Sequence, residues 1–103
     1  MDTQDLVDDL RRRGVETTRV ELKSATGGVP KSLPETLSAF ANTAGGPVLL
    51  GLDDDIQPVD IDVAAVRDAL AGIASNSMDP PVRGAIEIEV IDDGNRIVRL
   101  DVE

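Results

Sequence analysis

A chain of 103 residues has the size of one domain with a single hydrophobic core. Apolar residues make up 41% of it, but Phe40 is the only aromatic residue, which excludes base stacking on aromatic platforms. Cysteine and histidine are absent. Disulfides, zinc sites, thiol nucleophiles and histidine bases are therefore excluded, and any catalysis would depend on carboxylates.

The net charge of −10 is unevenly distributed along the chain. Residues 1–33 carry six Lys or Arg against six acids, whereas residues 34–103 carry four against fourteen. Because phosphate backbones are bound through Lys and Arg, only the N-terminal third is expected to face a nucleic acid. The start of the chain lacks the pattern of a signal peptide and no stretch has the length of a membrane span, so a cytoplasmic location is expected.

The first predicted element is a helix that begins after Asp2 and ends at Gly14. Leu6, Val7 and Leu10 form its apolar stripe. Arg11, Arg12 and Arg13 occupy its last turn, where basic residues compensate the helix dipole and add solubility. A nucleic-acid contact is the alternative interpretation of this triplet.

Residues 18–23 alternate with period two and predict a short half-buried strand, followed by a loop over 24–31. Ser32 and Glu35 match a capping box and predict the start of a second helix. The apolar stripe of that helix is Leu33, Leu37, Phe40 and Ala41, and Gly45-Gly46 ends it.

The unbroken apolar run over 48–52 favours a central strand covered on both faces. A third helix is predicted to start at Asp60 or Asp62, to bury Val63, Val66, Leu70 and Ile73, and to end at residues 75–77. Alternation over 86–90 and 98–102 around the turn at 92–95 predicts a hairpin. The order helix, strand, helix, strand, helix, strand, strand indicates an α/β (α+β) domain, with helices on a mixed sheet in two layers.

Four segments together resemble the Schlafen-type AlbA-like domain. They are VELKS at 20–24, ETLSAFANTAGG at 35–46, LLGLDD at 49–54 and the proline pair at 80–81. The resemblance extends from about Glu16 to the last strand and is most specific from Ser38 to Asp53. Two departures are visible: Leu22 stands where the family usually has an aromatic residue, and residues 56–60 replace a glycine-bearing hairpin.

The resemblance implies a small α/β domain, commonly at the N-terminus of bacterial regulators that continue into an ATP-binding-like region and a winged-helix segment. This chain would then be a fragment of a longer regulator. Animal relatives are similar to endoribonucleases that use three carboxylates and a divalent metal on transfer and ribosomal RNA. The matching acids here are Glu16, Glu21 and Asp53.

These three carboxylates are the expected ligands of Mg²⁺ or Mn²⁺, and Lys23 is the expected contact to the scissile phosphate. Glu21 and Lys23 are two residues apart on a strand and so point the same way. In the simpler interpretation, which is favoured over metal-dependent cleavage, Glu21 pairs with Arg19 or Lys23 on a solvated face, Glu16 lies in a loop and Asp53 only ends a strand. The loop from Ser24 to Ser32 is a better anion candidate than residues 42–46, because it leads into a helix N-terminus, but a plain connecting loop is the favoured interpretation.

Three functions remain open at this point. The leading hypothesis is a nucleic-acid-associated regulatory module that contacts the phosphates of DNA or structured RNA without reading sequence, through Arg11, Arg12, Arg13, Arg19, Lys23 and Lys31. The second is a divalent-metal-dependent endoribonuclease that uses Glu16, Glu21, Asp53 and Lys23. The third is an interaction domain without catalysis that forms a homodimer through the terminal hairpin or the first helix.

Overall fold

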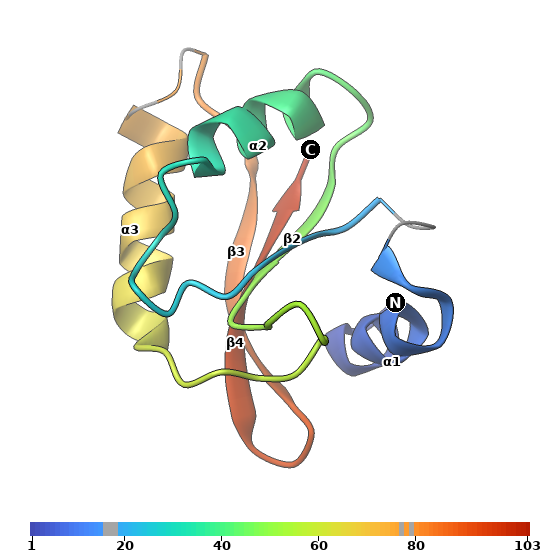
Figure 1. The fold of residues 1–103 in the computed structure, drawn as a ribbon. Helices are drawn as coiled ribbons and strands as arrows, with labels where there is room; N and C mark the ends of the chain where they lie inside the picture. The colour runs from blue at the N-terminus through green and yellow to red at the C-terminus, as the bar shows by residue number, and fades with distance from the viewer. Residues whose placement is uncertain (16–18, 77, 79) are drawn as a thin grey trace.

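The computed structural model describes residues 1–15, 19–76, 78 and 80–103. It contains three helices and a four-stranded sheet in the predicted order, which confirms the α/β class (Figure 1). The elements are α1 (Thr3–Arg13), β1 (Glu21–Lys23), α2 (Leu33–Ala41), β2 (Gly46–Leu50), α3 (Val63–Asn76), β3 (Gly84–Ile91) and β4 (Asn95–Val102). No helix in the described ranges is long and apolar enough to cross a membrane.

The sheet has the strand order β1-β2-β4-β3 and is mixed. β1 runs parallel to β2, with Glu21 opposite Val48, and β4 pairs antiparallel with both β2 and β3. β2 therefore has a hydrogen-bonded neighbour on each side, and Val48, Leu49 and Leu50 are completely buried. The predicted central strand is confirmed, and its continuous apolar run follows from burial on both faces.

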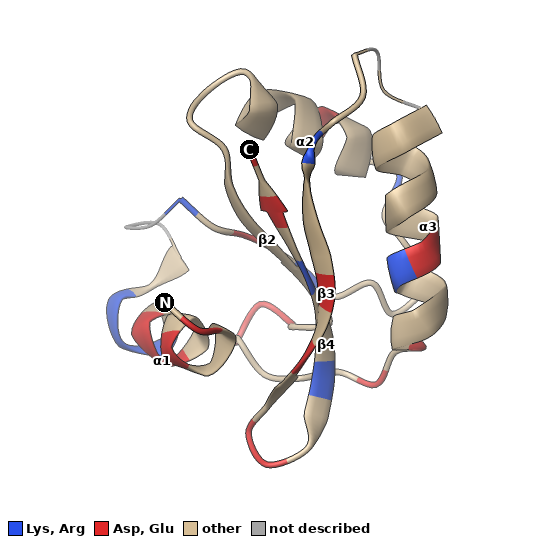
Figure 2. Cartoon of the chain, turned by 180° about the vertical axis from the view of Figure 1, so that it is seen from behind, with Lys and Arg blue, Asp and Glu red and all other residues tan. Residues whose placement is uncertain are grey.

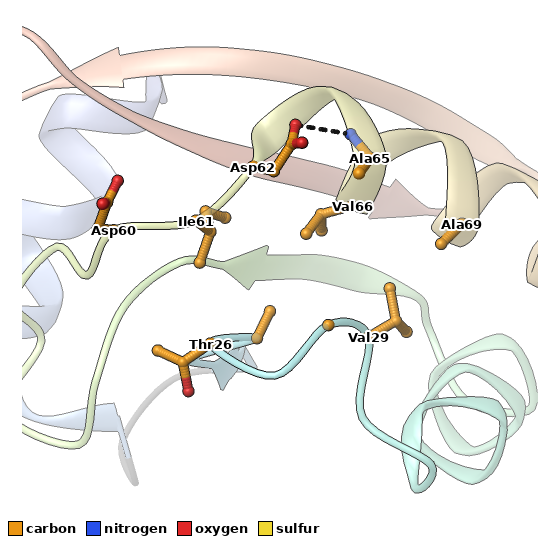
Figure 3. Close-up of a pocket in the computed structure, with 10 residues that line it drawn as sticks. Thr26, Val29, Asp60, Ile61, Asp62, Ala65, Val66 and Ala69 are labelled. Atoms are coloured by element: carbon orange, nitrogen blue, oxygen red, sulfur yellow. Dashed lines mark hydrogen bonds between the residues drawn. The ribbon is translucent and has the colours of Figure 1, made fainter.

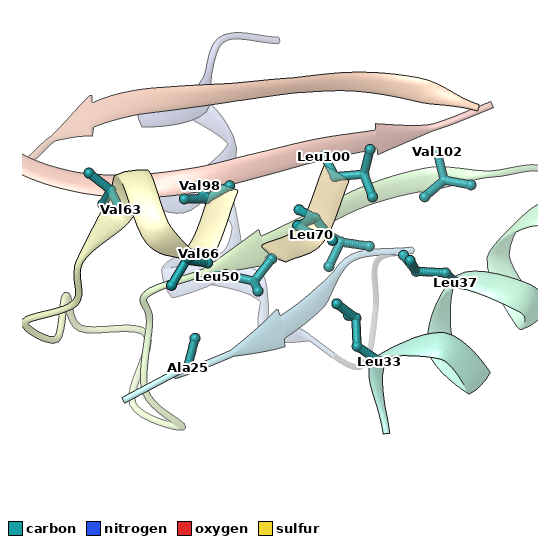
Figure 4. Packing of buried hydrophobic residues seen from close by; sticks show 11 residues of the cluster. Ala25, Leu33, Leu37, Leu50, Val63, Val66, Leu70, Val98, Leu100 and Val102 are labelled. Atoms are coloured by element: carbon teal, nitrogen blue, oxygen red, sulfur yellow. The ribbon is translucent and has the colours of Figure 1, made fainter. Parts of the chain in front are cut away.

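Helices cover both faces of this sheet. On one face α2 and α3 pack against alternate residues of β2 and β4, and Figure 4 shows this cluster around Leu50, Leu70 and Leu100. On the other face α1 packs against the intervening residues, among them Leu49 and Ile97. The molecule thus has one layer more than the two that were predicted, because α1 and the α2–α3 pair lie on opposite sides of the sheet (Figure 1).

The predicted side-chain caps at the starts of α1 and α3 are confirmed, whereas α2 begins directly after Ser32 as predicted but without the predicted cap. The Asp2 carboxylate accepts the Asp5 N–H at 2.8 Å, and the Asp62 carboxylate accepts the Ala65 N–H at 3.1 Å. Ser32 has a helical backbone and makes no side-chain cap, so the predicted capping box is wrong. Its hydroxyl instead accepts a hydrogen bond from Lys23 Nζ at 3.4 Å.

Two further details of the predicted elements need correction. Ala41 is exposed, so the apolar stripe of α2 consists of Leu33 and Leu37, with Phe40 partly buried beside them. The first strand is shorter than predicted and begins at Glu21; residue 18, like Ser77 at the predicted end of the third helix, lies outside the described residues. Phe40 and Leu37 nevertheless hold α2 against the same core as α3.

The predicted hairpin forms, with Ile91 opposite Asn95. Its turn places Asp92, Asp93 and Gly94 at φ values of 49°, 61° and 120°. Aspartate and glycine tolerate this left-handed region better than other residues do, which explains why an Asp-Asp-Gly sequence turns the chain here.

Candidate nucleic-acid interface

Glu21 and Lys23, two of the residues predicted for the site, lie next to each other on β1. The Glu21 carboxylate lies 3.4 Å from Lys23 Nζ, because residues two apart on a strand project to the same face. The Lys23 side chain is 23% exposed, so the ammonium group is partly shielded but still open to solvent. Lys23 and Glu21 therefore form one small polar group on the outer strand, next to the start of α2.

Asp53 stands directly after the apolar run and organises the loop that follows β2. Its carboxylate accepts the N–H groups of Asp55 at 2.9 Å and Gln57 at 3.0 Å. The Asp53 N–H also donates to the Gln57 carbonyl at 2.9 Å, and the turn that results buries Ile56. These bonds give Asp53 a visible structural role, since a side chain that accepts N–H groups two and four residues ahead fixes a turn.

The third predicted carboxylate, Glu16, lies outside the described residues. Among the residues that the structure describes, no group of three acidic side chains comes together to hold a metal. Glu21 is paired with Lys23, and Asp53 is bonded to its own turn. The described residues thus supply two of the three carboxylates that a Mg²⁺ or Mn²⁺ site of this kind would need, and we derive no metal-dependent step from them.

The arginine triplet at the end of α1 divides into two kinds of residue. Arg11 donates from both terminal nitrogens to the Asp92 carboxylate, at 2.9 and 2.6 Å, and from Nε to the Ile56 carbonyl at 3.0 Å. Arg12 and Arg13 lie 3.4 and 3.7 Å from Asp9, and their side chains are 69% and 61% exposed. Arg11 therefore joins α1 to the hairpin, while the side chains of Arg12 and Arg13 are largely exposed beside Asp9.

The Arg11 contact also controls the ionisation of its partner. The hydrogen bonds from Arg11 and Gln4 lower the pKa of Asp92 to about 2, and the bond to Asp92 raises the pKa of Arg11. Charge-assisted, bidentate hydrogen bonds of this kind favour the ionised forms of both groups. Asp92 and Arg11 are consequently both charged over the whole physiological range.

The remaining predicted cations flank β1. Arg19 is exposed and donates to the Thr43 hydroxyl beyond the end of α2. Lys31 is exposed at the end of the loop 24–31, where a depression of about 390 Å³ is lined by residues 23–31. β1 is an outer strand of the sheet, and the segment just before it and the loop after it lie at its opposite ends, the first toward α1 and the second toward α2 and α3 (Figure 1).

Charged residues of both signs occur on several elements of the protein. Figure 2 shows basic segments at the C-terminal end of α1, just before β1, on α3, before β3 and on β4, and acidic segments on α1, at the hairpin turn and in the loops before α3. Between Lys31 and Arg67 the sequence contains six acids and no Lys or Arg. The predicted basic residues are thus spread from the end of α1, which packs against β3, through the segment just before β1 to the start of α2.

The chain matches the Schlafen AlbA_2 family model over residues 16–103. It belongs to the Schlafen AlbA_2 family. Its structure is similar to the N-terminal domain of a RecG-related protein from Nitrosomonas europaea, which is named after ATP-dependent DNA helicases. The two share 30% sequence identity and superpose with a TM-score of 0.80, over 99% of this chain and 72% of that one.

Sequence reasoning missed two features of this Schlafen AlbA_2 domain. One is the contact of Arg11 and Gln4 with Asp92, which joins residues 81 and 88 positions apart. The other is a groove beside α3, which is lined in part by Asp60 and Asp62. Neither has a local sequence pattern, because each arises only when the loops and helices pack on the sheet.

Proposed function

We propose that this Schlafen AlbA_2 domain is a nucleic-acid-associated regulatory module that contacts phosphates along the side of β1. The observation that supports it most directly is that Arg19, Lys23 and Lys31 lie on or next to the outer strand β1. Arg12 and Arg13 add exposed basic side chains at the end of the helix that precedes it. Phosphate contacts from such side chains position a nucleic acid without reading its sequence. DNA and structured RNA are both suitable partners.

The overall charge of the domain affects both the affinity of this binding and its salt dependence. A net charge of −10 opposes the approach of a polyanion, so affinity is low and depends strongly on salt. Each phosphate neutralised on a duplex contributes a slope of about −0.9 to the logarithm of affinity against that of salt concentration. A chain that continues beyond this domain, as in the RecG-related relative, would supply further contacts.

The test is a fluorescence anisotropy titration of labelled transfer RNA and of a labelled DNA duplex at low salt. The double variant Arg19→Glu with Lys31→Glu is expected to weaken binding at least about tenfold. Arg67→Glu with Arg83→Glu makes the same charge change at exposed positions elsewhere, and should weaken binding much less. Equal losses in the two double variants would show that only net charge matters and would contradict a specific surface.

The same titration with Mn²⁺ separates binding from the metal-dependent ribonuclease that uses Glu16, Glu21, Asp53 and Lys23. Binding raises the anisotropy, whereas cleavage releases short fragments and lowers it. Cleavage that requires Mn²⁺ or Mg²⁺ and disappears in Glu21→Gln would make the domain a nuclease. A flat trace at every salt concentration, with neither metal having an effect, would exclude both functions for this domain.

A further inference from the structure

A groove of about 580 Å³ lies between the loop after β1 and the N-terminal half of α3. Its walls are mainly apolar: Val29 comes from the loop, Ile61 from the segment before α3, and Val66 and Ala69 from the helix. Figure 3 shows Thr26 and Val29 opposite Ile61 and Val66 across this space. Its volume falls within the range of roughly 300–1,000 Å³ that is typical of ligand sites.

Negative charge borders the groove at the end where α3 begins. Asp60 and Asp62 contribute to its lining, and no Lys or Arg does so. One Asp62 oxygen is bonded to the Ala65 N–H, whereas no hydrogen bond or ion pair of the Asp60 side chain is found within the described part of the chain. The groove thus combines an apolar floor with an acidic end that has no basic residue of this chain in it.

We propose that this groove binds a short segment of a partner protein in which aliphatic side chains are followed directly by Lys or Arg. The aliphatic groups lie against Val29, Val66 and Ala69, and the cation lies beside Asp60. Complementary charge favours this occupant over a nucleic acid, whose phosphates the two aspartates repel. It also disfavours a second copy of this chain, which carries a net charge of −10.

The ligand test uses three blocked hexapeptides added to the ¹⁵N-labelled full chain. Gly-Leu-Ile-Lys-Lys-Gly combines both features, Gly-Leu-Ile-Glu-Glu-Gly reverses the charge, and Gly-Ser-Ser-Lys-Lys-Gly removes the apolar part. The first peptide is expected to shift the amide signals of residues 26–29 and 65–69 and to bind at least tenfold more tightly than the other two. Its affinity should fall as salt rises, because one contact is ionic.

Two variants on α3 test the location. Ala65 lines the groove and is exposed, so Ala65→Leu fills the site without disturbing the core. This variant should lower the affinity for the first peptide at least tenfold. Ala64 is equally exposed on the same helix but is not part of the lining, so Ala64→Leu should change the affinity less than twofold. Circular dichroism and thermal unfolding confirm that both variants are folded.

The acidic end of the groove is tested by Asp60→Asn. This variant is expected to lower the affinity for the first peptide about threefold to fivefold and to make that affinity depend less on salt. Asp62 is left unchanged because it caps α3. The proposal is overturned if the first peptide causes no shifts at millimolar concentration, or if the acidic peptide binds as well. It is also overturned if Ala64→Leu weakens binding as much as Ala65→Leu does.

Discussion

At the scale of single residues, Arg11 shows how one side chain can connect distant parts of the chain. It lies in α1, and its guanidinium is bonded to Asp92 in the hairpin turn and to the carbonyl of Ile56. Both charged side chains are only about a quarter exposed, at 25% and 26%, so water screens the pair less than at an open surface.

Arg11→Met keeps much of the apolar stem but removes these contacts. We expect it to lower the free energy of unfolding by about 1–3 kcal/mol, since Asp92 and the Ile56 carbonyl lose a charged donor. Urea unfolding of the variant and wild type measures this difference. Arg12→Met is the matched control, and its effect should stay within about 0.5 kcal/mol because Arg12 is exposed. Equal effects would show that Arg11 has no special role.

Asp92 makes the stability of the domain depend on pH. Its folded pKa of about 2 lies below the ordinary value of 3.8, so the folded state favours the ionised carboxylate. The stabilisation is present above pH 4 and is lost as pH falls from about 4 through 2, and partial exposure limits it to at most about 2 kcal/mol.

Asp92→Asn isolates this contribution from that of the other acids. The stability difference between wild type and Asp92→Asn should be largest near neutral pH and should shrink between about pH 4 and pH 2. Urea unfolding at pH 7, 4 and 2.5 measures it. Asparagine tolerates the left-handed backbone at this position, so the substitution does not strain the turn. A difference that stays constant over this range would contradict the lowered pKa.

At the scale of elements, the junction between α2 and β2 depends on close contact between backbones. Gly45 has a φ of +73°, its N–H donates to the Phe40 carbonyl at 2.9 Å, and it lies against the end of β4. A Cβ at this position would be 2.1 Å from the Val102 carbonyl oxygen. The glycine therefore ends the helix and also lets β2 enter the sheet beside β4.

Gly45→Ala should accordingly destabilise the domain by about 2–4 kcal/mol, because both the backbone conformation and the contact with Val102 become unfavourable. Thermal unfolding followed by circular dichroism measures the loss. Gly27→Ala is the control: no atom lies within 4 Å of its Cβ position and its φ is not positive, so we expect a change below about 0.5 kcal/mol. Similar values for the two would contradict the steric argument.

At the scale of the whole molecule, the sheet separates two cores. Leu49 and Leu50 are neighbours on β2, yet Leu49 belongs to the cluster with α1 and Leu50 to the cluster with α2 and α3. Both side chains are completely buried. The two helical layers thus pack against opposite faces of the same strand.

Each Leu→Ala change at these positions should cost about 2–5 kcal/mol of unfolding free energy. Their local effects should differ, because Leu49→Ala loosens only the α1 side. Hydrogen exchange is expected to accelerate mainly in α1 for Leu49→Ala and mainly in α3 for Leu50→Ala. Equal acceleration of both helices in both variants would indicate one undivided core.

The sequence by itself determined the elements whose signals are local. Asp2 and Gly14 bound α1 through their own backbone and side-chain preferences, and the alternation of Ile86, Ile88, Val98 and Leu100 defined the hairpin. The motifs around residues 35–54 were sufficient for the family. The capping box did not form: Ser32 has a helical backbone, unlike a typical N-cap residue, and its hydroxyl accepts a hydrogen bond from Lys23, a contact that no four-residue pattern contains.

The tertiary structure alone decided how these elements face one another. An apolar stripe shows that a helix is buried but not on which side of the sheet, so only packing placed α1 opposite α2 and α3. The same holds for Arg11, which the sequence grouped with Arg12 and Arg13 and which packing bonded to Asp92. Contacts between residues far apart along the chain depend on how the sheet brings them together, and local patterns do not encode that arrangement.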